Sequence, residues 1–166
     1  SMSTEIVAKK MKLLFVTNVD WFFISHRLPV ALAALKAGHE VHIATFLTRP
    51  VEELESYGLN VHPLASRRNN FGLFSLAESF IEIYRLFRNV KPDVVHLVTI
   101  KPLLLGGIVA NLVRVPGLVV AISGLGSMFI SERPFVRLLK LCLLPLYRIA
   151  LRHRNLKIII QNEDDR

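Results

Sequence analysis

Cysteine is nearly absent from this sequence of 166 residues, in which Cys142 is the only one. A single thiol excludes an internal disulfide framework and any zinc site built from several thiolates, and it is typical of a reducing cytoplasm. Long apolar stretches are missing too. The run 103–113 is followed by Arg114 and Pro116, which makes it too short for a membrane span, and the first ten residues contain no apolar segment of the secretory kind.

Acidic residues are the minority, since 13 Asp and Glu stand against 21 Lys and Arg and leave a formal charge of +8. This balance favours an anionic partner. Basic residues are not interleaved with stacking aromatics, so we do not expect nucleic acid. On a predicted helix at 134–153 they share about a third of the circumference with leucines beside them, which predicts binding to an anionic membrane surface, although a solvated face has the same pattern. These residues are Arg133, Arg137, Lys140, Arg148 and Arg152.

Glycine is missing from the loop after the first predicted strand, residues 18–29. A dinucleotide-binding domain needs G-x-G-x-x-G there, because the pyrophosphate must approach the backbone. A phosphate-binding P-loop pattern is missing as well, so we expect no nicotinamide or flavin cofactor. The sequence also has no Asp-x-Asp, and its six histidines are scattered.

Short runs rich in Val and Ile alternate with helical patterns along the chain, which predicts a doubly wound parallel sheet of Rossmann-like α/β type in a single domain at 11–161. We expect Gly38, Gly58 and Gly117 to end helices or form turns in a left-handed conformation. We interpret residues 1–10 as a tag remnant and a flexible N-terminus. The predicted strands are 12–17, 40–45, 59–64, 93–98, 118–123 and 157–161, and the predicted helices are 25–37, 51–57, 74–89, 102–113 and 134–153.

The loops that follow the strands carry the candidate site, because parallel sheets bind ligands at the carboxyl ends of their strands. His26 is expected to open the helix after the first strand, and two arginines and a lysine after later strands could contact phosphate oxygens. Two glycines after the fifth strand allow close approach of a ligand. The candidates are Asn18, Asp20, Trp21, His26, Arg27, Arg67, Arg68, Lys101, Ser123, Gly124 and Gly126.

Three runs in order, HEVHIAT, KPDVVHLVTIKPLLLGGIVANL and VVAISGLGSMF, resemble the amino-terminal domain of bacterial family 4 glycosyltransferases. The likeness is greatest to those that build undecaprenyl-linked surface polysaccharides. It implies the GT-B architecture, in which one Rossmann-like domain binds the acceptor and a second, facing one binds the nucleotide-sugar. Residues 162–166 would then begin the crossing to a donor-binding domain that this chain does not contain.

The resemblance implies the acceptor-binding half of a retaining glycosyltransferase, which moves a sugar from a nucleotide-sugar to a polyprenyl-diphosphate-linked glycan. It also implies that no metal ion is needed, which is consistent with the missing Asp-x-Asp and the scattered histidines. The enzyme would be cytoplasmic and peripheral at the inner face of the plasma membrane, and this chain alone would be inactive. His26 or Asp20 would orient or deprotonate the attacking hydroxyl. Related enzymes often have paired glycines in the first loop and a histidine where Ser123 and Gly124 stand here.

Two other hypotheses are compatible with the sequence. The chain could be a noncatalytic subunit that anchors the donor-binding chain of a split glycosyltransferase at the membrane. It could also be a flavodoxin-like domain that binds a small ligand. An open reading frame that continues past Arg166 into a second Rossmann-like half would favour the two-domain enzyme, and a stop codon there would favour the subunit.

Overall fold

The computed structural model describes residues 10–65, 72–122 and 156–160. They form one six-stranded sheet, in which every strand pairs with its neighbours in parallel in the order β3-β2-β1-β4-β5-β6. This confirms the predicted doubly wound α/β fold. The strands are β1 Lys12–Val19, β2 Glu40–Phe46, β3 Asn60–Pro63, β4 Val94–Val98, β5 Gly117–Ile122 and β6 Leu156–Ile160, and the helices are α1 Asp20–His26, α2 Leu28–Lys36, α3 Val51–Glu55, α4 Leu73–Val90 and α5 Ile100–Leu112.

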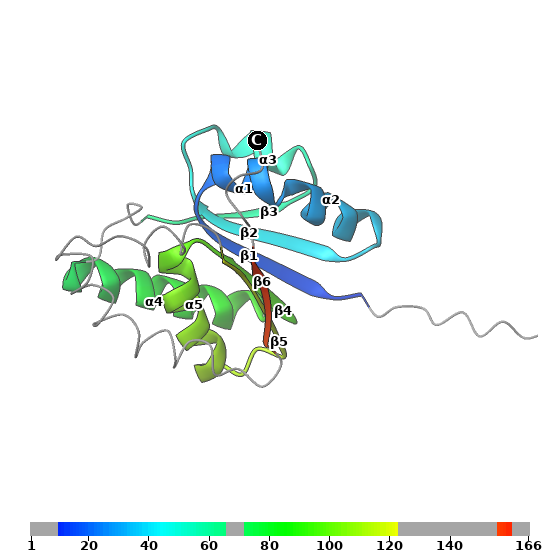
Figure 1. The fold of residues 1–166 in the computed structure, drawn as a ribbon. Coiled ribbons are helices and arrows are strands. Elements are labelled where there is room, and N and C mark those ends of the chain that lie inside the picture. The colour runs from blue at the N-terminus through cyan, green and yellow to red at the C-terminus, as the bar shows by residue number, and fades with distance from the viewer. Residues whose placement is uncertain (1–9, 66–71, 123–155, 161–166) are drawn as a thin grey trace, which may run out of the picture.

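The helices lie in two layers, with α1, α2 and α3 on one face of the sheet and α4 and α5 on the other (Figure 1). The strand order explains this division. From β1 the chain adds β2 and β3 on one side, and it then returns to the middle and adds β4 and β5 on the other side. Since each crossover between parallel strands is right-handed, reversing the direction of growth moves the helices to the opposite face.

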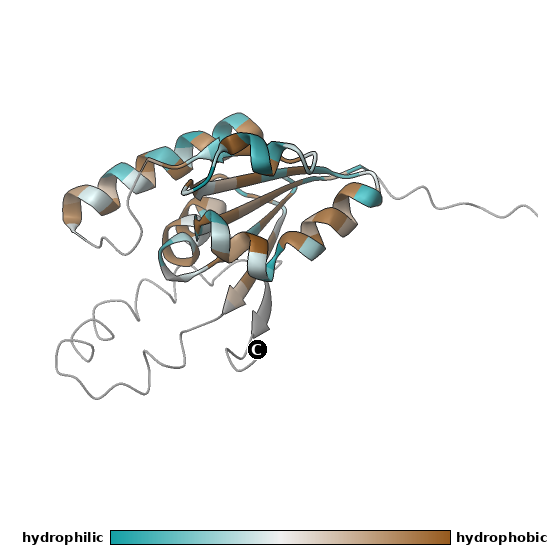
Figure 2. Ribbon diagram, turned by 90° about the horizontal axis from the view of Figure 1, so that it is seen from above, coloured by the Kyte–Doolittle hydropathy of each residue, from teal (hydrophilic) through white to brown (hydrophobic). Residues whose placement is uncertain are grey.

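The strands β1, β2 and β4 are largely apolar and buried, as expected of a sheet that lies between helices, and Figure 2 shows them as a mostly hydrophobic layer. Leu14 and Val16 of β1 belong to the core cluster with Phe87 of α4. Phe15, between them, points to the other face and packs in a second cluster with Phe23 of α1. Alternation of side chains along one strand thus supplies both cores.

The first helical segment differs from the prediction of one helix at 25–37. Helix α1 already begins at Asp20 and ends at His26, and α2 follows after Arg27, whose φ of −124° and ψ of −16° are not helical. Pro29 accounts for the break, because it lacks an N–H and its ring would clash with the carbonyl of residue 25 inside a continuous helix. At the second position of α2, a proline is well tolerated.

Two of the three predicted glycine turns are confirmed, since Gly38 and Gly58 have φ of 92° and 93°. The prediction for Gly117 is wrong. The left-handed residue after α5 is Arg114, with φ of 57°, and Gly117 is the first residue of β5. The small size of Gly117 matters for packing instead, because a Cβ there would lie 3.1 Å from Cγ2 of Val94 on the neighbouring strand.

Candidate functional site

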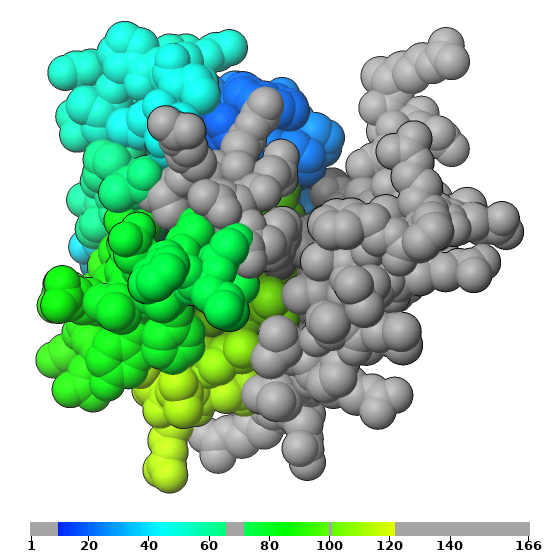
Figure 3. Space-filling view, turned by 90° about the vertical axis from the view of Figure 1, so that its left-hand side faces the viewer, coloured from blue at the N-terminus to red at the C-terminus, as the bar shows by residue number. Residues whose placement is uncertain are grey.

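A small pocket opens at the carboxyl end of β1, between α4 and α5. Figure 3 shows the side of the molecule on which α4, in green, lies below the cyan segment that follows β2. The pocket unites Asn18 and Lys101, two residues that the sequence predicted for ligand binding from separate loops. This is the edge at which parallel sheets of this kind bind ligands. The pocket is lined by Thr17, Asn18, Leu64, Ser79, Glu82, Ile83, Lys101, Pro102 and Leu105.

A buried cation and a carboxylate line this pocket together. Lys101 in the first turn of α5 is only 5% exposed, and its Nζ donates a hydrogen bond of 3.3 Å to Oγ of Ser75. Burial lowers the pKa of Lys101, while the nearby charge of Glu82 opposes that shift. Oε2 of Glu82 accepts the backbone N–H of Ala65 at 3.0 Å. The pocket therefore offers both charge-assisted donors and acceptors to a ligand.

Two hydroxyl groups in the pocket have unused hydrogen-bonding capacity. Thr17 and Ser79 are 0% and 2% exposed, and neither Oγ atom has a hydrogen-bond partner among the residues described. Leaving a buried polar group unpaired costs about 1–3 kcal/mol. A ligand group that both donates and accepts hydrogen bonds, such as a sugar hydroxyl, would satisfy them.

The junction of β4 and α5 beside the pocket is conformationally strained. Thr99 has φ of 73° and ψ of 165°, a region occupied almost only by glycine, and a β-branched side chain there costs about 1–3 kcal/mol. Its Oγ1 accepts the backbone N–H of Asn18 at 3.2 Å and donates to the carbonyl of Val98. The strained residue thereby couples the end of β1 to the first turn of α5, which carries Lys101.

Asp20 lies at the expected edge, but its carboxylate is engaged with the protein. The residue is fully buried and accepts hydrogen bonds from the backbone N–H groups of Trp21, Thr48 and Arg49 and from the Thr48 hydroxyl, at 2.6–3.0 Å. Burial alone would raise the pKa of Asp20, but these hydrogen bonds outweigh it and hold the pKa below its ordinary value. This arrangement favours a structural role, in which Asp20 ties α1 to the segment after β2.

His26 does not open a helix at the crevice, as the sequence suggested, but closes α1. Its ring is exposed, stacks on Phe22 at a centroid distance of 4.1 Å, and places Nδ1 3.1 Å from the Phe22 carbonyl oxygen. Helical rise separates it from Asp20 by about 9 Å. The reason for assigning His26 to the crevice therefore no longer holds. Trp21 is 43% exposed, and Arg27 is buried on the α1 and α2 side of the sheet, away from the pocket.

Several predicted residues lie outside the described part of the chain. These are Arg67 and Arg68 after β3, Ser123, Gly124 and Gly126 after β5, and the basic set Arg133, Arg137, Lys140, Arg148 and Arg152, together with Cys142. Sequence reasoning in turn missed Thr17, Ser79 and Glu82. The available signal was a polar residue at an inward position of an otherwise apolar strand or helix.

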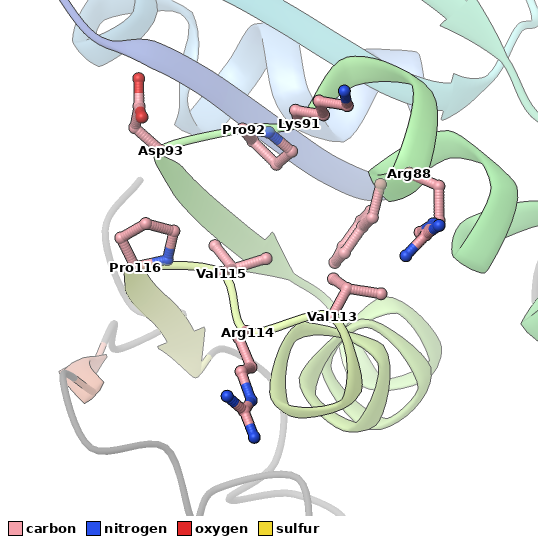
Figure 4. A pocket seen from close by; sticks show the side chains of 9 residues that line it. Arg88, Lys91, Pro92, Asp93, Val113, Arg114, Val115 and Pro116 are labelled. Carbon is pink, nitrogen blue, oxygen red and sulfur yellow. The ribbon is translucent and has the colours of Figure 1, made fainter.

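A larger hollow, of about 490 Å³, lies at the opposite edge, where β4 and β5 begin (Figure 4). Arg88 and Lys91 come from the end of α4, and Arg114 from the turn after α5. Cations at these positions are favourable next to the carbonyl ends of the two helices. Because ligands bind at the carboxyl ends of strands in such sheets, we place the functional site at the smaller pocket.

Among residues 10–65, 72–122 and 156–160, no group of three His, Cys, Asp or Glu side chains is arranged to hold a metal ion. Over those ranges, no helix combines the length and the apolar character needed to cross a bilayer.

The fold is shared with enzymes that act on nucleotide-sugars or transfer sugars. A glycosyltransferase from Rickettsia africae aligns with a TM-score of 0.56 at 16% identity, over 93% of this chain and 44% of its own. UDP-GlcNAc 2-epimerase from Methanocaldococcus jannaschii aligns with a TM-score of 0.59 at 19% identity, over 88% of this chain and 38% of its own. MurG from Acinetobacter baumannii aligns with a TM-score of 0.55 at 13% identity, over 93% of this chain and 46% of its own. This chain thus spans less than half the length of each, and no curated protein matches it significantly.

Residues 12–162 match the family described as glycosyl transferase 4-like, and the chain belongs to that family. Its Rossmann-like sheet is that of a GT-B domain, as the glycosyltransferase neighbours show.

Proposed function

We propose that this chain is the acceptor-binding domain of a retaining glycosyltransferase, which transfers a sugar from a nucleotide-sugar to a polyprenyl-diphosphate-linked glycan in surface polysaccharide synthesis. The observation that carries the proposal is the pocket after β1, where unpaired hydroxyls of Thr17 and Ser79 lie beside Glu82 and Lys101. Hydroxyls and a carboxylate suit a sugar, and a buried lysine suits a phosphate oxygen.

Each polar residue of the pocket, and the two arginines after β3, would contact one part of the acceptor. Lys101 would contact the acceptor diphosphate, and Arg67 and Arg68 after β3 would share that charge. Thr17, Ser79 and Glu82 would bind a single hydroxyl of the first acceptor sugar, because the pocket has a volume of only about 20 Å³. Positioning of the acceptor, and stabilisation of the departing nucleotide diphosphate by the facing domain, would supply most of the catalysis.

A mass-spectrometric transfer assay tests the proposal. This chain and the complete product of its gene are each incubated with a panel of nucleotide-sugars and polyprenyl-diphosphate-linked acceptors. We expect transfer by the complete product and none by this chain. Lys101→Met should lower kcat/KM by about 10- to 150-fold, because a charge-assisted hydrogen bond contributes about 1.5–3 kcal/mol. Lys36→Met, at an exposed lysine of α2, is the matched control and should leave kcat/KM unchanged.

Other outcomes of this assay would point elsewhere. Transfer that requires a second, separately encoded chain would identify this protein as the anchoring subunit of a split enzyme. Turnover of a nucleotide-sugar by this chain alone, free of contaminating enzyme, would contradict the division of labour proposed here. Wild-type kcat/KM in Lys101→Met would remove the pocket from the acceptor site.

A further inference from the structure

Arg27 is buried, yet none of the acidic residues that the structure describes forms an ion pair with its side chain. The residue joins α1 to α2 and is 4% exposed. Its backbone is held on both sides, since its N–H donates to Phe23 at 2.7 Å and its carbonyl accepts from Ala31 at 3.1 Å. Over the described ranges, no ion pair or side-chain hydrogen bond involves its guanidinium. Buried charges in proteins are ordinarily paired, because an unpaired one is costly.

The unpartnered atoms of Arg27 are a specific pair. Nε and Nη2 are both buried, and no hydrogen-bond acceptor reaches either of them in the part of the chain that the structure describes. These two nitrogens carry the parallel N–H bonds along one edge of the planar guanidinium. That edge is the one with which arginine grips two oxygens of a carboxylate or a phosphate. Because bulk water does not reach these atoms, hydration does not replace the missing acceptor.

His96 of β4 supplies a further unpartnered nitrogen close by. Its ring is 7% exposed and stacks on Phe15 at a centroid distance of 4.8 Å, and its buried Nε2 has no partner among the residues described. Burial, and after it the positive charge of Arg27, lowers the pKa of His96 to about 4. The buried acid of α1 offers no compensation, because both oxygens of Asp20 are bonded to Thr48 and to backbone N–H groups.

We propose that Arg27 and His96 form a binding site for an oxyanion, with two of its oxygens on Nε and Nη2 of Arg27 and His96 as a further donor. The site is distinct from the pocket after β1, which lies on the opposite face of the sheet between α4 and α5. It does not depend on the proposed function. The oxyanion is either the phosphate of a free ligand or a carboxylate side chain of a polypeptide that packs on this face.

Thermal melts in different salts test this site. The wild-type chain is melted in sodium phosphate, acetate and chloride at equal ionic strength, alongside Arg27→Lys, Arg27→Met and the exposed control Arg85→Met. At an anion concentration of about ten times the dissociation constant, binding should raise the wild-type Tm by about 3–6 °C relative to the Tm in chloride. We expect the same rise in Arg85→Met and little or none in the two Arg27 variants. Arg27→Lys keeps the positive charge but loses the two parallel N–H donors of the guanidinium edge.

A second measurement follows His96 directly. The ring nitrogens are titrated by NMR in each salt, and a bound anion should raise the His96 pKa because it favours the protonated ring. A rise of the Tm and of the His96 pKa in phosphate but not in acetate would identify the ligand as a phosphate. The same rises in acetate would identify it as a carboxylate. A wild-type Tm and a His96 pKa that are the same in all three salts would overturn the proposal. This comparison within the wild type decides even if an Arg27 variant fails to fold.

Discussion

Asp20 holds Thr48 with both of its carboxylate oxygens: Oδ1 accepts the Thr48 hydroxyl at 2.6 Å and Oδ2 accepts its backbone N–H at 2.8 Å. This contact fastens the start of α1 to the segment between β2 and α3, and Arg49 adds a further N–H bond of 3.0 Å to Oδ2. A carboxylate that the sequence suggested for catalysis therefore stabilises the functional edge of the sheet.

Asp20→Asn should destabilise the chain, because an amide presents one donor group to N–H and O–H groups that all need an acceptor. Hydrogen bonds to a charged group contribute about 1.5–3 kcal/mol each, so we expect a loss of roughly 2–4 kcal/mol in the free energy of unfolding. Urea denaturation measures it, with the exposed Glu55→Gln on α3 as the control. An Asp20→Asn chain as stable as the wild type would mean that this carboxylate is not structural.

Stability should fall in mild acid because of His96. The pKa of His96 is about 4 in the folded chain and about 6.5 in the unfolded chain, so on lowering the pH between these values only the unfolded chain takes up the proton. The full stabilisation is present above about pH 6.5, and about 3 kcal/mol of it is lost by about pH 4. Urea unfolding at several pH values, in buffers free of phosphate and carboxylate, measures this loss.

His96→Gln should reduce the loss of stability in acid relative to the wild type, because the glutamine takes up no proton. The comparison with the wild type separates His96 from His42 and His62, whose pKa values are also lowered by burial. Identical pH profiles for wild type and His96→Gln would refute the assignment.

Thr99 combines strain with a useful hydrogen bond, and two substitutions separate the two effects. Thr99→Val keeps the β-branched side chain at positive φ but loses the bond from the Asn18 N–H, so stability should fall by about 1 kcal/mol. Thr99→Gly also loses that bond but relieves about 1–3 kcal/mol of strain, and it should be at least as stable as Thr99→Val. Chemical denaturation of both variants checks the order. A less stable glycine variant would show that the backbone is not strained there.

Membrane binding through the basic residues remains a prediction from the sequence. Replacing Arg137, Lys140 and Arg148 together by glutamine should weaken binding to anionic vesicles by roughly two orders of magnitude, because each such charge contributes about 1 kcal/mol. Raising the salt concentration should mimic the substitution. Co-sedimentation with vesicles, with and without anionic lipid, measures both effects. Equal sedimentation of wild type and triple variant would leave these residues as a solvated face.

The strands could be predicted because most of them are short runs rich in Val and Ile that end at Gly, Pro or polar residues, and in β1, β2 and β4 these runs are largely buried. The region after β1 could not. Helix α1 has only seven residues, and its aromatic sequence DWFFISH resembles a binding loop as much as a helix. Its start depends on the Asp20 hydrogen bonds to Thr48 and Arg49, which come from a distant part of the chain.

The sequence by itself determined the alternation of strands and helices, and with it the parallel sheet. Those properties follow from local patterns of apolar residues and from the handedness of crossovers. Only the tertiary structure decided which polar groups are satisfied. Asp20 is bonded to Thr48, whereas no acceptor within the described ranges reaches Nε or Nη2 of Arg27. Such outcomes depend on strand order and register, which bring residues from separate loops together, and no local pattern encodes them.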